Sequence, residues 1–230
     1  MIHTLPETGS TNADLLAQAA TGAPEGRWLR ADRQTGGRGR LGRAWLSPPG
    51  NLYASTIVRP LAGDPPTATL AFVAAIALEE VASAYAGANR LQLKWPNDLL
   101  AGPAKLAGIL LEASGGAVVI GFGVNLAHHP DLPDRPTTSI AALAGAAPDP
   151  HSFLLDLADS FARWLARWRS EGFAPIRARW LARAHPRGTP LRSGDTQALF
   201  EGLAEDGALL LRHADGGIEE IRAGDVFLAS

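Results

Sequence analysis

The chain has 230 residues, a formal net charge of −2 at neutral pH and no cysteine. Its length suits one substantial core with a small additional domain, and its charge argues against a general nucleic-acid binder, because such affinity depends on neutralising phosphates. The lack of cysteine excludes disulfides, thiolate metal sites and cysteine nucleophiles, which suits a reducing compartment.

The N-terminal segment MIHTLPETGSTN has neither the basic nor the apolar region of a secretory signal. The longest apolar run, residues 68–78, is too short to span a bilayer. We therefore expect a cytoplasmic protein with no membrane partner.

Strands and helices alternate in the first half of the chain. Ser10 stands before TNADLLAQAA and is typical of an N-cap that opens a short helix. A strand is predicted over 27–32. Alternating apolar residues predict a half-buried strand over 51–59, and an apolar stretch over 67–86 predicts a helix packed against a sheet.

The second half begins with three predicted strands and ends in a group of short ones. The three strands cover 91–96, 106–114 and 117–126. The last two are expected to form a hairpin around a Ser-Gly-Gly turn. Residues 128–136 predict a loop, and 151–169 predict an amphipathic helix. From about Pro190 onward, closely spaced turns predict a small β-barrel or meander of about forty residues.

Between the first two predicted strands lies QTGGRGRLGRAW, which contains the spacing G-x-G-x-x-G. A dinucleotide-binding turn with this spacing opens a helix, whereas here a proline-rich break and a strand follow. The protein kinase variant is excluded too, because Ala44 stands where a valine is required. A mobile, cationic loop with Arg38, Arg40 and Arg43 remains, and we expect it to be a lid over an anionic ligand.

The two lysines of the chain are singled out by its composition. Of the 21 basic residues all but Lys94 and Lys105 are arginine. A lysine in such a chain indicates a need for a compact ammonium rather than a planar guanidinium, with chance as the alternative. Both lysines flank the most polar motif in the sequence.

Four polar clusters stand at predicted strand or helix ends: GSTN, QTGGRGRLGRAW, KWPND with KLAG, and GFGVN. In this order, and over nearly the whole chain, they resemble the biotin protein ligases, and GRGRxGRxW and KWPNDxxxxxxKLAGIL carry the resemblance most specifically. The family implies an α+β fold, in which helices back a mixed β-sheet similar to class II aminoacyl-tRNA synthetase cores and a small SH3-like β-barrel follows. On this basis we predict a catalytic domain over 1–187 and a barrel over 188–230.

Two features depart from the family pattern. Gly36 stands where alanine is common, a change that we expect only to loosen the loop. Residues 185–202 lack a clear form of the glycine-valine strand entry that usually opens the C-terminal domain. No residue roles are predicted there.

The resemblance implies an ATP-dependent biotin–protein ligase. Biotin and Mg-ATP would give biotinyl-5'-adenylate and pyrophosphate, and the acyl group would then pass to a lysine of a biotin carboxyl carrier protein or domain of a biotin-dependent carboxylase. The implied cofactors are ATP and Mg²⁺, with the metal ligands unknown; the adjacent His128 and His129 lack a spaced third ligand. Because so few residues precede Thr11, we expect no helix-turn-helix domain and no DNA partner. A homodimer is left open.

The site residues follow from the family motifs position by position. The expected catalytic residues are Lys105, beside the biotin carboxylate and α-phosphate, Arg40, on the developing phosphate charge, and Asp98, beside the acceptor lysine. The residues expected to bind biotin are Ser10, Thr11, Asn12, Gln34, Gly37, Arg38, Lys105 and Gly108. The residues expected to bind ATP or the adenylate are Arg38, Arg40, Arg43, Trp45, Asn51, Lys94, Asn97 and Asn125. Trp45 would stack on adenine, with core packing as the alternative.

Three alternative functions fit the sequence less well than biotin ligation. A lipoate or octanoate ligase or transferase shares the fold, but the octanoyl transferases rely on a cysteine that this chain lacks. A nucleic-acid-binding regulatory module would use RGRLGR as a phosphate-contacting patch, against the net charge. A purely structural domain would require the four clusters and both lysines to coincide by accident.

Overall fold

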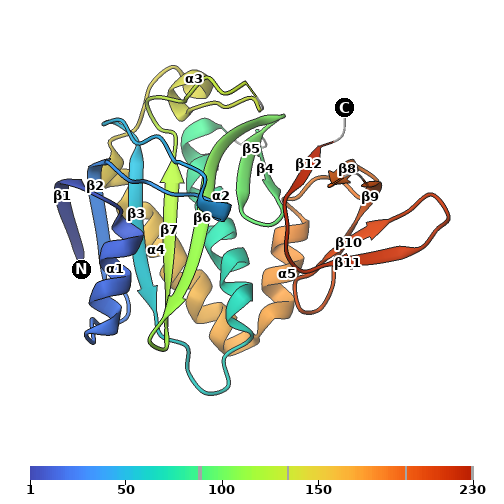
Figure 1. Ribbon diagram of the computed structural model, residues 1–230, viewed down its shortest axis with the longest axis horizontal. Helices are drawn as coiled ribbons and strands as arrows, with labels where there is room; N and C mark the ends of the chain where they lie inside the picture. The colour runs from blue at the N-terminus through green and yellow to red at the C-terminus, as the bar shows by residue number, and fades with distance from the viewer. Residues whose placement is uncertain (88–89, 134, 195, 229–230) are drawn as a thin grey trace.

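The computed structural model describes residues 1–87, 90–133, 135–194 and 196–228. Its main body is a seven-stranded mixed sheet with helices on both faces, and a second sheet of five strands follows at the C-terminal end (Figure 1). This arrangement confirms the predicted α+β fold.

The elements follow the chain in this order. The main sheet contains β1 (Ile2–Thr8), β2 (Trp28–Gln34), β3 (Leu52–Val58), β4 (Leu91–Lys94), β5 (Asp98–Ala101), β6 (Ala104–Ser114) and β7 (Ala117–Val124). The helices are α1 (Thr11–Ala20), α2 (Leu70–Ala86), α3 (Ile140–Ala144), α4 (Pro150–Glu171) and α5 (Phe173–Leu181), with short 3-10 turns η1 (Arg40–Gly42) and η2 (Thr67–Thr69). The second sheet contains β8 (Pro190–Ser193), β9 (Thr196–Leu203), β10 (Leu209–Arg212), β11 (Ile218–Ile221) and β12 (Val226–Leu228).

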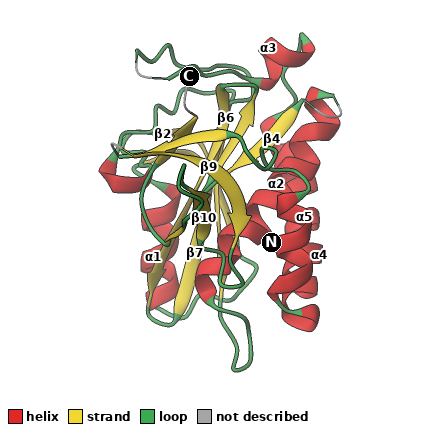
Figure 2. Ribbon diagram, turned by 90° about the vertical axis from the view of Figure 1, so that its right-hand side faces the viewer, coloured by secondary structure: helices red, strands yellow, loops and turns green. Residues whose placement is uncertain are grey.

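The main sheet has the order β1-β2-β3-β7-β6-β5-β4, in which β1 and β2 are parallel and the other neighbours are antiparallel. Helix α1 covers one face, and α2 and α4 cover the other (Figure 2). Strand β3 is buried at every position because both of its faces are covered. The strand predicted over 51–59 is confirmed, but the prediction that it is half-buried is wrong. The predicted hairpin is confirmed, since Ser114 of β6 pairs with Ala117 of β7.

Helix α2 is apolar on nearly all sides, as its sequence predicts, and packs against α4 and α5. By length and composition the segment Thr67–Ala86 could cross a membrane, and within the described residues it is the one helix that could. However, 72% of that apolar window is buried inside the fold, which is typical of a core helix. Glu79 is fully buried and ion-paired with Arg179 of α5 at 3.0 Å and with Arg183, just after that helix, at 2.6 Å, as a charge removed from water requires.

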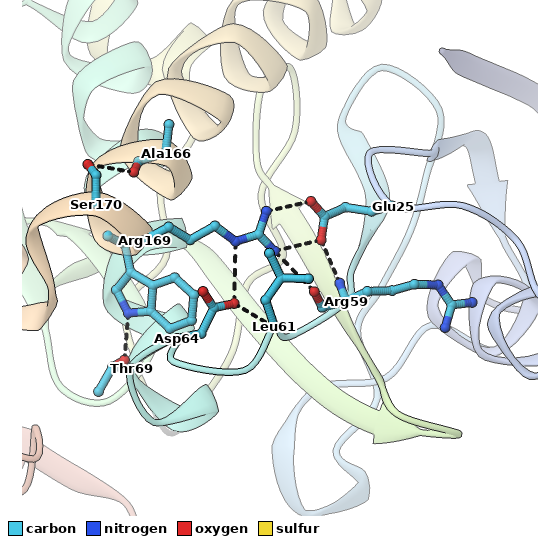
Figure 3. A network of polar contacts seen from close by, with 9 residues as sticks. Glu25, Arg59, Leu61, Asp64, Thr69, Ala166, Arg169 and Ser170 are labelled. Carbon is cyan, nitrogen blue, oxygen red and sulfur yellow. Dashed lines mark hydrogen bonds and ion pairs between the residues drawn. The ribbon is translucent and has the colours of Figure 1, made fainter.

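A polar network links α4 to the loop before β2 and to the loop after β3 (Figure 3). Arg169 of α4 donates to both carboxylate oxygens of Glu25 at 2.7 and 2.8 Å, and its Nε lies 3.3 Å from Asp64. Glu25 also accepts the backbone N–H of Arg59 at 2.7 Å. The Arg169 guanidinium holds the pKa of Glu25 below its ordinary value. The network fixes this end of α4 against the sheet.

The elements absent from the sequence prediction include β1, β5 and α5, and each of these three was missed for a physical reason. Strand β1 lies at the sheet edge with exposed residues on both faces, so its sequence shows no apolar alternation. Strand β5 has four residues and begins at Asp98, inside a motif that reads as a turn. Helix α5 begins directly after α4, separated from it only by Gly172 at a φ of 80°.

The C-terminal sheet has the order β11-β10-β9-β8-β12 and packs on α5. The ring of Phe200 lies 6.5 Å from that of Trp180, and the indole of Trp95 donates to the carbonyl of Gly207 at 3.2 Å. The two sheets therefore share one hydrophobic core. The predicted short strands are confirmed, while the division of the chain at residue 187 stays a prediction.

Candidate active site

A cavity of about 730 Å³, open to solvent, lies where the start of α1, the glycine-rich loop and the β4–β5 turn meet over β6 and β7. Asp225 of the C-terminal domain also lines it. The predicted site residues that line this cavity are Ser10, Thr11, Asn12, Gln34, Arg38, Arg40, Arg43, Trp45, Asn97, Asp98, Lys105 and Gly108. These residues come from three of the four polar clusters, and Gly121, Phe122 and Gly123 of the fourth, GFGVN, line the same cavity.

One end of the cavity is polar and is built at the start of α1, where Ser10 is the N-cap, as predicted. The backbone N–H of Thr11 donates to Gln34 Oε1 at 2.9 Å, and the Thr11 hydroxyl lies 2.7 Å from Ser55 Oγ. Ser55 donates to Asn12 Oδ1 at 2.6 Å. Thr11, Asn12 and Ser55 are all buried. Because buried polar groups need partners, these bonds fix the side chains in place.

The floor of the cavity is made of glycines, which leave room for two side chains. A Cβ at Gly121 would lie 2.2 Å from Asn12 Oδ1, and one at Gly123 would lie 2.6 Å from Trp45 Cε2. A Cβ at Gly108 would lie 3.3 Å from the same indole. The motif GFGVN therefore reflects close approach of Asn12 and Trp45 to the sheet, since any larger residue would displace them.

A cluster of charges lies beside the floor. Asp98 accepts from the ammonium of Lys105 at 2.5 Å and from that of Lys94 at 3.2 Å. Burial would raise the pKa of Asp98, but the two ammonium groups outweigh burial and hold it below its ordinary value. Burial lowers the pKa of Lys105 despite its contact with Asp98. The cluster thus presents a partly buried ammonium to the cavity, held by one carboxylate.

The glycine-rich loop folds back on itself over the cavity. Arg38 pairs with Ala44 in an antiparallel bridge, and Leu41 has a left-handed φ of 56° at the exposed tip. Gly37 lies so close to the returning chain that a Cβ there would be 2.6 Å from the carbonyl oxygen of Trp45. Glycine at this position is required by packing rather than by a positive φ.

The loop arginines are bonded to residues far away in the sequence. Arg43 forms an ion pair with Asp225, and Arg40 lies 3.8 Å from the same carboxylate. Arg40 also donates to the carbonyl of Gly224 at 3.0 Å and to Asn97 Oδ1 at 3.5 Å. Burial lowers the pKa of Arg40, and a guanidinium stays charged at neutral pH regardless. Two fixed cations therefore face the cavity.

Trp45 lines this cavity and also a second one of about 400 Å³, which is likewise open to solvent. The Lys105 ammonium lies 5.6 Å from the centre of the Trp45 ring. The indole Nε1 is buried without a hydrogen-bond partner among the described residues. The second cavity is lined by Ala44, Trp45, Leu46, Lys105, Asn125, Pro130, Leu132, Arg135 and Thr137. Ala44, Trp45, Lys105 and Arg135 line both cavities.

Three predicted residues, Gly37, Asn51 and Lys94, line neither cavity. Asn51 is buried, and its Oδ1 accepts the backbone N–H groups of Leu126, Ala127 and His128, each at 2.9 Å. Its amide thus organises the loop after β7. Lys94 reaches the site only through Asp98. Nucleotide contacts of Asn51 and Lys94 stay predictions.

Three residues that the motifs did not indicate contribute to the site. Ser55 is a polar residue inside an apolar strand, which is a signal that the sequence does offer. Glu112 accepts from Asn12 Nδ2 at 2.8 Å, and Asp225 holds the loop arginines. Sequence gives no comparable signal for these two, because both bonds join segments that only the fold brings together.

The mixed sheet, its helical backing and the small C-terminal sheet define a class II aminoacyl-tRNA synthetase-like catalytic domain with an SH3-like domain attached. A sequence profile described as the Biotin/lipoate A/B protein ligase family matches residues 7–125, and one described as the Biotin protein ligase C terminal domain matches 190–229. The chain belongs to the biotin/lipoate A/B protein ligase family.

Individual relatives agree with this assignment. The chain is 44% identical to a biotin--[acetyl-CoA-carboxylase] ligase of Paracoccus denitrificans over 97% of this chain and 98% of the relative. The structure resembles the biotin protein ligase from Aquifex aeolicus in complex with biotin and ATP, with a TM-score of 0.88, 27% identity and 99% of both chains covered. It also resembles the Leishmania major biotin protein ligase in complex with biotinyl-5-AMP, with a TM-score of 0.71, 25% identity, and 96% and 98% covered.

Proposed function

We propose that this protein is an ATP-dependent biotin–protein ligase. In the first step a biotin carboxylate oxygen attacks the α-phosphorus of ATP, and pyrophosphate leaves. In the second step a carrier lysine amine attacks the acyl carbon, AMP leaves, and the amine loses a proton as the amide forms. The names of the relatives in Paracoccus and Aquifex support this activity.

The observation that carries the proposal is the position of Lys105. Lys105 lines both the polar cavity and the second cavity, and its ammonium contacts Asp98 and the Trp45 ring. A biotin head group in the first cavity and adenine in the second would place the carboxylate and α-phosphate beside this ammonium. A compact cation there stabilises the two anionic oxygens as the anhydride bond forms.

The other residues have roles that follow from their places. Thr11 and Gln34, with Ser10, would bond the ureido group, and Trp45 would stack on adenine. Arg40 and Arg43 would meet the charge that develops on the α-phosphate and pyrophosphate, under a loop that excludes water. Asp98 would bind the acceptor ammonium and accept its proton when the amine attacks.

The residues that the structure describes do not form a cage for Mg²⁺. Within the described parts of the chain no group of three or more His, Asp or Glu side chains is placed to hold a metal ion. The carboxylates that line the cavity, Asp98 and Asp225, are both paired with cations. Any Mg²⁺ would enter with the ATP phosphates and water, as this ion commonly does.

The acceptor we propose is a biotin carboxyl carrier domain, which the name of the Paracoccus relative supports. A cytoplasmic location suits an enzyme that uses ATP, has no cysteine and modifies this acceptor. A homodimer is compatible with the exposed edge strand β1. Each of these statements is open to direct measurement.

Calorimetric titration with biotin, and then with a non-hydrolysable biotinyl-adenylate mimic, tests the first step. We expect binding that is much tighter for the mimic, because it fills both cavities. Incubation with biotin, ATP and a biotin carboxyl carrier domain, followed by streptavidin blotting, tests the second. Labelling should require ATP. No binding of either ligand, or faster pyrophosphate release with lipoate or octanoate than with biotin, would overturn the proposal.

A further inference from the structure

A chain of hydrogen bonds leads from the surface of β6 to the polar end of the cavity. Glu112 accepts from Asn12 Nδ2 at 2.8 Å. Asn12 Oδ1 accepts from Ser55 Oγ at 2.6 Å, and Ser55 lies 2.7 Å from Thr11 Oγ1. Ser55, Asn12 and Thr11 are buried, whereas Glu112 is exposed. An exposed carboxylate is thus connected to a hydroxyl that lines the cavity.

The chemistry of these groups fixes the direction of every bond. A carboxylate only accepts, so the Asn12 atom facing Glu112 must be the amide nitrogen. The carbonyl of Leu110, 3.4 Å away, also accepts from that nitrogen. Asn12 therefore turns its oxygen toward Ser55, and Ser55 must donate its single proton there. Facing Thr11, Ser55 can then only accept.

The Thr11 hydroxyl consequently donates its proton to another protein residue and not to a ligand in the cavity. Its acceptors are Ser55 Oγ at 2.7 Å and Gln34 Oε1 at 3.2 Å. The oxygen of Gln34 is fixed in turn, because the backbone N–H of Thr11 donates to it at 2.9 Å. Thr11 Oγ1 thus offers the cavity a lone pair and no proton.

The other end of Gln34 has the opposite polarity. Its Nε2 donates one proton to Ser47 Oγ at 3.2 Å, and Ser47 donates onward to the carbonyl of Trp45 at 2.9 Å. The second proton on Nε2 has no such role in the described bonds. The polar end of the cavity therefore places an acceptor at Thr11 next to a donor at Gln34.

We propose that Glu112, acting through Asn12 and Ser55, is a positioning residue that selects a head group with an N–H donor facing Thr11. This inference rests on the proposed function and deepens it, because a cyclic urea carries N–H donors beside a carbonyl acceptor. A head group without such a donor leaves the lone pair of Thr11 buried and unpaired. A site built around a hydrogen bond rejects analogues that lack it more strongly than a pocket selects by size.

The test compares biotin with its two cyclic carbamate analogues, in each of which one ureido N–H is replaced by oxygen. The ligands have nearly the same shape and differ in one donor. Dissociation constants are measured by calorimetry for the wild-type protein and for Glu112→Gln, Glu112→Lys and Ser55→Ala. Glutamine can donate or accept, so Glu112→Gln allows the hydrogen bonds from residue 112 to Thr11 to run in either direction. Lysine can only donate, so Glu112→Lys favours the reversed direction.

We expect the wild-type protein to prefer biotin over one of the carbamates. Glu112→Gln should reduce that preference by roughly three- to tenfold, and Glu112→Lys should reduce it further. Ser55→Ala, which removes the nearer of the two acceptors of the Thr11 proton, should act in the same direction. Glu219→Gln and Glu219→Lys remove an exposed strand carboxylate that pairs with His213, and they should leave the preference unchanged.

The outcomes distinguish failure of the proposed function from failure of the proposed role of Glu112. If the wild-type protein binds neither biotin nor the adenylate mimic, the proposed function fails. If it binds biotin but both Glu112 variants keep the wild-type preference between biotin and the carbamates, the function stands and the polarity proposal is overturned. Equal weakening of all three ligands would also overturn it, because that result indicates a purely structural role.

Discussion

Arg43 of the glycine-rich loop is ion-paired with Asp225 of the C-terminal domain. The same carboxylate lies 3.8 Å from Arg40, and the carbonyl of the adjacent Gly224 accepts from Arg40 at 3.0 Å. The C-terminal domain thus supplies a negative charge to two cations of the loop. Since those cations are the groups that we expect to meet the phosphates, a phosphate can take the place of Asp225.

Asp225→Asn removes the charge and keeps the size of the side chain. Without a phosphate the loop should then be held less firmly, and trypsin should cut after Arg38, Arg40 or Arg43 about three- to tenfold faster. The adenylate mimic should abolish this difference, because its phosphate supplies the missing charge. Mass spectrometry of timed digests gives the rates. Asp206→Asn, which removes an exposed partner of Arg222, is the control; equal loop cleavage in both variants would contradict the idea.

Lys105→Ala tests the ammonium that reaches both cavities. Losing it should slow adenylate formation by two or more orders of magnitude, on the scale of removing a fixed charge from a transition state. The fold should remain, because the side chain adds little to the hydrophobic core. Pyrophosphate release with biotin and ATP reports the rate, and circular dichroism reports the fold. A near-normal rate in Lys105→Ala would show that the residue is not catalytic.

The pH dependence of the first step follows from the same cluster. The pKa of Asp98 is lowered from 3.8, so this carboxylate stays charged at neutral pH and is protonated only in strong acid. The pKa of Lys105 is lowered from 10.5, so the ammonium is lost earlier on the alkaline side than in a free lysine. The rate should therefore fall as the pH rises toward 10.5. Lys105→Arg should be slower but should lose this alkaline decline, because arginine keeps its charge. An alkaline decline that is the same in both proteins would exclude Lys105 as its source.

The glycine floor predicts two separable defects. Gly121→Ala should displace Asn12 and weaken biotin binding, whereas Gly123→Ala should displace Trp45 and weaken ATP binding. Each should also cost about 1–3 kcal/mol of unfolding free energy, as for overpacked sites. Gly9→Ala is the control, because nothing lies within 4 Å of its added Cβ. Thermal melts and separate titrations with each ligand distinguish the variants; equal loss of both ligands in both variants would argue against this division.

Local patterns in the sequence predicted much of this architecture. Ser10 caps α1, and β6 and β7 form a hairpin, because capping and tight turns depend on neighbouring residues. The edge strand β1 was not predicted, because its exposed faces show no apolar alternation and its partner β2 lies beyond α1. The strand β5 was not predicted, because its four residues begin inside a motif that reads as a turn. In the site, sequence motifs placed Lys105 and Asp98 near each other. No motif could indicate that Asp225 lines the same cavity.

Arg40→Gly tests whether the glycine-rich loop retains the intermediate. A lid stabilises charge on the phosphate and keeps the mixed anhydride away from water and stray amines. Removing the guanidinium breaks its bonds to Gly224 and Asn97, and glycine adds backbone freedom.

The variant should still form biotinyl-adenylate, bind it more weakly and release it into solution, where it acylates exposed lysines of other proteins. The enzyme itself is a poor target, having only Lys94, Lys105 and its N-terminal amine. Incubation with biotin, ATP and a lysine-rich bystander protein without a carrier domain, followed by streptavidin blotting, measures the escape against wild type and a sample without ATP. The decisive quantity is bystander labelling per pyrophosphate released. A rise in this ratio supports retention by the loop, whereas an unchanged ratio means that Arg40 acts on adenylate formation alone.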